Sequence, residues 1–123
     1  MNQIEQKIKE NWPSAVEGDL DHQEFGLVHY WYGEQYNRIV LRFSFEGQDE
    51  SESEKIFFIN LKHGSWILSH ISTFKISDSK LQLVKNQSFK ERDELEKKYR
   101  SIFELILEDR KKRSFSNELF DMS

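Results

Sequence analysis

The strongest constraint on the fold comes from a segment in the middle of the chain in which apolar and polar side chains alternate. Residues 39–46 read IVLRFSFE, with a large apolar side chain at every second position. Because successive side chains of a strand point to opposite faces, this period of two predicts a strand with one buried and one largely solvated face. Similar runs are LVHYWY at 27–32, KIFFINLKH at 55–63 and WILSHISTFKI at 66–76, and LQLV at 81–84 can add a fifth strand. The segment therefore predicts an antiparallel meander of four to five strands.

Helical spacing is found at the two ends of the chain. Ile4, Ile8 and Trp12 recur every four residues, and Pro13 then ends a short N-terminal helix, because the residue before a proline is driven out of the helical region. Near the other end the sequence SFKE, beginning at Ser88, has the form of a capping box. The helix that follows carries an apolar stripe formed by Leu95, Tyr99, Ile102, Phe103 and Ile106. The stripe predicts a long C-terminal helix packed on one face of the sheet, and hence an α+β fold.

The length of 123 residues fits one domain. No repeat and no linker rich in Pro and Gly divides the chain, so residues 1–113 are predicted to form a single domain and 114–123 a C-terminal tail that can be flexible. The N-terminus lacks the apolar segment of a secretory signal, and the longest apolar run is too short to span a bilayer. These features predict a cytoplasmic protein.

A tight turn at HGS, residues 63–65, predicts which side chains share a face of the sheet. Opposed residues of a hairpin lie on the same face, so parity places Phe57, Ile59, Leu61, Trp66, Leu68 and His70 on the buried face. The opposite face, which includes Ile71, is half apolar and is predicted to be partly covered or used for contact. The aromatic strand 27–32 is left open, because both of its sides are aromatic.

The acidic residues are concentrated in the first half of the chain. Residues 1–60 hold 5 Lys/Arg and 12 Asp/Glu, whereas residues 61–123 hold 13 and 10. The acids cluster in EGDLDHQE at 17–24, which reads as part of an acidic connection at 14–24, and in the turn EGQDESESEK at 46–55. This balance argues against binding to a phosphate backbone and favours a cationic protein partner.

Candidate catalytic and metal sites are weak. The chain has no cysteine, which excludes disulfides and thiolate chemistry. His63 and His70 share the predicted face but lie on the order of 13 Å apart along the hairpin, too far to hold one ion. The D-x-D-H at residues 19–22 lacks the other ligands of a calcium loop. No nucleophile elbow or phosphate-binding glycine loop is present, so no metal, no cofactor and no enzymatic activity are predicted.

The stretch HGSWILSHI, residues 63–71, resembles the late hairpin of NTF2-like cone proteins, in which a turn leads into a Trp and an alternating strand. This resemblance implies a ligand-binding or catalytic pocket around His70 and Trp66. The overall plan of a small acidic α+β domain looks like that of bacterial immunity proteins, which neutralise toxins such as nucleases. A third possibility is a secretion chaperone that binds an unfolded segment on the half-apolar face.

The leading hypothesis is therefore a protein that blocks the active site of a basic toxin, an immunity protein. Carboxylates would pair with Lys and Arg of the partner, and neighbouring aromatic side chains would anchor the contact. The predicted partner-binding residues are Asp19, Asp21, Glu24, Trp31, Tyr32, Asp49, Glu50, Glu52 and Glu54. No contact with nucleic acid or membrane is predicted.

Overall fold

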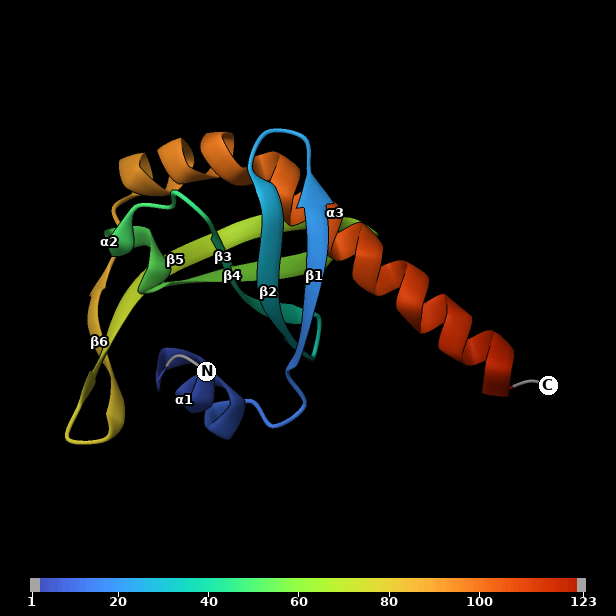
Figure 1. The fold of residues 1–123 in the computed structure, drawn as a ribbon, viewed down its shortest axis with the longest axis horizontal. Coiled ribbons are helices and arrows are strands. Elements are labelled where there is room, and N and C mark those ends of the chain that lie inside the picture. Colours follow the sequence, from blue (N-terminus) through green and yellow to red (C-terminus); the bar gives the residue numbers. More distant parts are fainter. Residues whose placement is uncertain (1–2, 122–123) are drawn as a thin grey trace.

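The computed structural model describes the backbone of residues 3–121, together with the side chains in this range except those of 3, 35, 50, 53 and 113–121. Along the chain the elements are α1 (Gln3–Asn11), β1 (Val16–His22), β2 (Gly26–Gln35), β3 (Arg38–Phe45), α2 (Glu50–Ser53), β4 (Lys55–Lys62), β5 (Ser65–Ser77), β6 (Lys80–Asn86) and α3 (Phe89–Asp121). The six strands form one antiparallel sheet in sequential order, with α1 and α3 on opposite faces (Figure 1). The predicted α+β fold is confirmed, and the meander has six strands.

The additional strand is β1, which occupies the segment predicted to be an acidic connection. Its residues alternate strictly: Val16, Gly18, Leu20 and His22 are half-buried, whereas the acidic residues between them are exposed. The prediction was wrong because this segment has few apolar side chains, so its period of two is hard to recognise among the three carboxylates. β1 pairs along its whole length with β2, Val16 opposite Tyr32 and His22 opposite Gly26.

The main core lies between the sheet and α3. The stripe predicted for the C-terminal helix is confirmed, since Tyr99, Ile102, Phe103 and Ile106 are all almost completely buried. They pack on a single face of the sheet, to which the strands contribute Val28, Tyr30, Ile39, Leu41, Phe43, Phe57, Ile59, Leu68 and Ile71. The predicted capping box starts α3, because the Ser88 hydroxyl accepts a hydrogen bond from the Glu91 backbone N–H at 3.2 Å.

The half-apolar face of the sheet is covered by α1, as the sequence predicted for part of it. Ile4 and Ile8 pack with Val40, Ile56 and Phe58 in a second, smaller cluster. This arrangement settles the orientation of β2: Val28, Tyr30 and Tyr32 face α3, whereas Trp31 points to the α1 side opposite Arg42.

A β-bulge in β5 corrects the predicted place of His70. Ile59 pairs with Leu68 but Phe58 pairs with His70, so Ser69 is an extra residue in the ladder. The insertion reverses the parity of the rest of β5. Ile71 therefore joins the main core, while the His70 ring stacks on Phe58 across the other face, with ring centroids 4.3 Å apart.

α3 is longer than the sheet that it covers. Its first half crosses the sheet, and its second half extends past β1 away from the body of the domain (Figure 1). The helix continues to Asp121, and the last two residues lie outside the described part of the chain. Whether residues 114–123 are flexible stays a prediction.

Candidate functional site

Strand topology brings the two acidic segments to the same end of the sheet. Val28 at the start of β2 pairs with Phe45 at the end of β3. The β1–β2 turn at 23–25 therefore lies beside the loop at 46–49, although twenty residues separate them. We call this end of the sheet, with α2, the acidic end.

Four carboxylates at the acidic end are available to a partner. Asp21, Glu24, Glu46 and Glu54 are exposed, and in the described part of the chain none of these side chains forms a hydrogen bond or ion pair. Asp49 is also exposed, but its carboxylate caps α2 by accepting the Ser51 backbone N–H at 3.1 Å. This bond and one from the Ser51 hydroxyl lower the pKa of Asp49, which keeps it ionised.

Glu52, by contrast, faces the interior. Its side chain is buried, with the Tyr99 hydroxyl donating to one carboxylate oxygen and Lys98 Nζ 3.0 Å from the other. The predicted role of Glu52 in partner binding is therefore corrected: this carboxylate ties the acidic loop to α3. The side chain of Glu50 lies outside the described residues.

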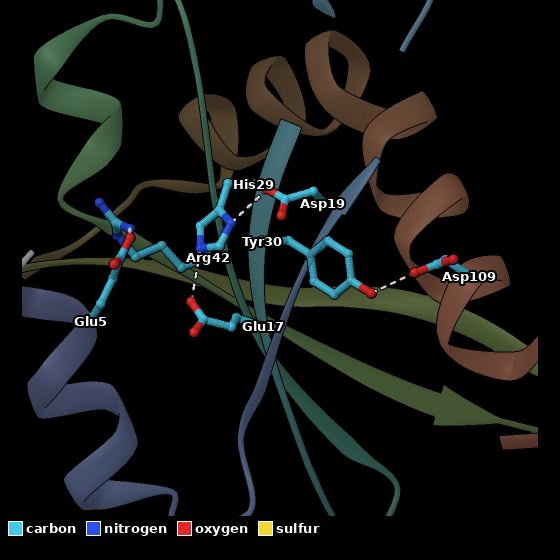
Figure 2. A network of polar contacts seen from close by, with 7 residues as sticks. All are labelled: Glu5, Glu17, Asp19, His29, Tyr30, Arg42 and Asp109. Atoms are coloured by element: carbon cyan, nitrogen blue, oxygen red, sulfur yellow. Dashed lines mark hydrogen bonds and ion pairs between the residues drawn. The ribbon is translucent and has the colours of Figure 1, made fainter. Parts of the chain in front are cut away.

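Asp19 belongs to a three-residue arrangement on the outer face of β1 and β2. Its Oδ1 lies 2.8 Å from His29 Nδ1, and Glu17 Oε2 lies 3.0 Å from His29 Nε2 (Figure 2). Each ring nitrogen of His29 therefore lies within hydrogen-bond distance of one carboxylate. Sequence reasoning missed Glu17 and His29, because their proximity depends on the pairing of β1 with β2.

The expected aromatic anchors are not both at the surface. Trp31 is 1% exposed and lies beneath Lys9 of α1, whose Nζ is 5.8 Å from the centre of the ring. A partner cannot reach it, which corrects its expected role. Tyr32 is half-buried, and its hydroxyl donates to Glu34 at 2.9 Å. It lies at the other end of the sheet from the acidic segments.

At that other end an open groove of about 1470 Å³ separates α3 from the sheet. Its apolar floor is formed by Val16, Tyr32, Ile39, Leu61, Trp66 and Leu107. Basic side chains at the end of β4 and on α3 form its rim, among them Lys62, Arg110, Lys111 and Lys112. Trp66 lines the groove, but His70 lies on the opposite face of the sheet and takes no part in it, so the two residues of the pocket expected from cone proteins are not brought together.

A polar contact joins the sheet to α3 beside the groove. Tyr30 Oη donates to Asp109 Oδ2 at 2.6 Å (Figure 2), and the Arg110 guanidinium lies 5.8 Å from the centre of the Tyr32 ring. Burial and the bond to Asp109 raise the pKa of Tyr30. The contact ties β2 to α3 beside the groove.

The described side chains offer little for catalysis. No group of three or more His, Asp or Glu in this part of the chain is placed to hold a metal ion. Burial lowers the pKa of His70, whose Nδ1 lies 3.2 Å from the Ser69 hydroxyl, and no carboxylate of the described residues forms a hydrogen bond with this ring.

The fold class comes from the structure itself, because comparison with known proteins found no match. The chain is an antiparallel α+β domain of six sequential strands with a helix on each face. No family description matches it, and neither a curated protein nor a solved structure is significantly similar to it. Within the described residues, none of the helices combines the length and the apolar character needed to cross a bilayer.

We expect the stability of the domain to fall at alkaline pH. Burial, followed by hydrogen bonds to carboxylates, raises the pKa of Tyr32 and Tyr99. A raised pKa in the folded state favours the protonated phenol, so this stabilisation is complete below the unfolded value of about 10 and is lost as the pH rises above it. Urea unfolding at a series of pH values from neutral to strongly alkaline measures the loss. A free energy of unfolding that stays constant above the unfolded value would contradict it.

Proposed function

We propose that the protein is a binding protein of the immunity type, which neutralises a cationic toxin domain in the cytoplasm by covering its active site. The observation that carries the proposal is the convergence of two distant acidic segments at one end of the sheet. There Asp21, Glu24, Glu46 and Glu54 stand exposed, and none of their side chains has a hydrogen-bond or ion-pair partner among the described residues. Like charges gathered in this way do nothing for folding, and they complement a cleft lined by Lys and Arg.

The mechanism is electrostatic capture followed by occlusion. Long-range attraction between the acidic end and the basic cleft would raise the association rate above that of uncharged surfaces. Asp49 supports this role, because its capping bonds hold a charged carboxylate in a fixed position. Asp19 lies 2.8 Å from His29 Nδ1, so part of its hydrogen-bonding capacity is already used within the domain.

Association kinetics with the captured partner test the proposal. The partner is obtained by affinity capture from the source cell, or by expressing the adjacent reading frame, and must be basic and lose its activity on binding. We expect Asp21→Asn combined with Glu54→Gln to lower the association rate roughly fivefold to tenfold at low salt, and to reduce its dependence on salt.

The matched control removes the same charge elsewhere. Glu10 on α1 and Asp78 in the β5–β6 turn are exposed. Both of these elements lie away from the β1–β2 turn (Figure 1). Glu10→Gln combined with Asp78→Asn should leave the association rate within about twofold, because steering depends on local charge. If both pairs slowed association equally, net charge would explain the effect and the acidic end would have no special role.

The groove favours a second kind of binding over a catalytic pocket. The predicted pocket required His70, which lies on the far side of the sheet from the groove. An open groove with an apolar floor and a basic rim has instead the composition of a surface that binds another chain.

A further inference from the structure

The groove exists because α3 leaves the sheet before the apolar face of the sheet ends. Ile106 is fully buried, but Leu107 is only half-buried and the helix then continues past β1 (Figure 1). Beneath this part of the helix Tyr32, Leu61 and Trp66 are half-buried. Part of the apolar surface of these three side chains therefore packs in the core, and the rest is exposed in the groove.

The charge around the groove is opposite to that of the acidic end. Both acidic residues of the rim have internal partners: Glu34 accepts the Tyr32 hydroxyl, and Glu108 lies 3.2 Å from Lys112 Nζ. Lys62 and Lys111 are exposed, and no carboxylate in the described part of the chain pairs with either. The Tyr32 hydroxyl is neutral and does not cancel the charge of Glu34, but four basic side chains face two carboxylates among the lining residues, so the net charge of the rim is positive.

The dimensions favour a polypeptide over a small molecule. Pockets for small ligands usually measure about 300–1,000 Å³ and enclose most of the ligand. This groove is about 1470 Å³ and is open along one side. Side chains placed along an extended or helical segment can reach the floor and the rim at the same time.

We propose that the groove binds an acidic peptide segment of a partner protein. Aromatic or aliphatic side chains of the segment would pack beside Trp66 and Leu61, and its carboxylates would face Lys62 and Lys111. This surface lies at the opposite end of the sheet from the acidic end. The protein would accordingly hold two partners of opposite charge, and the two sites fail or succeed independently.

Selection from a random peptide library displayed on phage, using the full chain as bait, tests this directly. We expect the enriched sequences to combine Asp or Glu with Trp, Phe or Leu. A fluorescently labelled consensus peptide is then titrated and followed by anisotropy. Lys62→Glu combined with Lys111→Glu should weaken its binding at least about tenfold, because two favourable charge contacts become repulsive.

The control variant carries the same charge change outside the groove. Lys75 and Lys97 are exposed and do not line it, so Lys75→Glu combined with Lys97→Glu should change the affinity by less than about threefold. Enrichment of basic peptides, no enrichment at all, or equal losses in the two variants would overturn the proposal. So would sedimentation showing that the protein self-associates through this surface, since the occupant would then be a second copy of the chain.

Discussion

Replacing Glu5 by leucine is expected to destabilise the protein by roughly 3–5 kcal/mol, because it leaves a buried arginine without its carboxylate. Arg42 is 2% exposed and its Nη1 lies 2.5 Å from Glu5 Oε1 (Figure 2). Burial lowers the pKa of Arg42, while the Glu5 charge opposes this shift. The pair fastens α1 to the sheet next to Trp31, so its loss should also loosen the smaller core.

Urea unfolding measures this effect, and a second substitution identifies its cause. In the Arg42→Met background no charge remains to be compensated, so the double variant with Glu5→Leu should recover to within about 1–2 kcal/mol of the wild type. Glu10→Leu provides the control on α1, since Glu10 is exposed and its pair with Lys7 across one helical turn lies at the surface. A double variant less stable than Glu5→Leu alone would show that the charge on Arg42 is not what matters.

The parts of the fold that the sequence predicted are those with strong periodicity. The alternation in β3 and β4 and the stripe on α3 determine both the elements and the faces that they bury, because each apolar side chain there is large. The same reasoning failed at β1. A strand at the edge of a sheet needs only a few apolar contacts, and there Gly18 and the acidic residues leave almost no apolar signal.

The position of His70 could not have been obtained from parity. One inserted residue at Ser69 reverses the faces of the strand beyond it, and nothing in WILSHISTFKI distinguishes a bulged strand from a regular one. Because of the bulge, His70 does not line the groove, and its ring stacks on Phe58 instead.

The candidate sites depend on contacts between distant segments, which is why only their composition could be predicted. The acidic character of the 46–55 turn is evident in the sequence, but the inward rotation of Glu52 toward Tyr99 is a tertiary contact. The groove likewise depends on two features of the tertiary structure: the direction in which α3 runs past the sheet, and the register in which β1 pairs with β2. The burial of Trp31 follows from α1 lying over β2, whereas the sequence left both faces of that strand open.

Gly18→Ala is expected to cost about 2–4 kcal/mol of stability, an unusually large effect for a single methyl group on an edge strand. A Cβ at Gly18 would lie 2.7 Å from both Cζ and Oη of Tyr30, which is its neighbour across β1 and β2. The Tyr30 ring is fully buried and cannot retreat, and its hydroxyl must cross Gly18 to reach Asp109. The substitution therefore combines overpacking with the strain or loss of a hydrogen bond to a carboxylate.

A double-mutant cycle separates this steric cause from any general weakness of β1. In the Tyr30→Leu background the conflict is removed, so Gly18→Ala should then cost less than about 0.5 kcal/mol, even though the background itself is less stable. Asp21→Ala, on the exposed side of the same strand, should also be nearly neutral. Because the bond from Tyr30 to Asp109 ties β2 to α3 beside the groove, Gly18→Ala should in addition weaken binding of the acidic peptide at the groove. If Gly18→Ala lowered the free energy of unfolding by the same amount in the wild-type and Tyr30→Leu backgrounds, this account would be disproved. Glycine would then be required at position 18 by the conformation of β1 and not by contact with the Tyr30 ring.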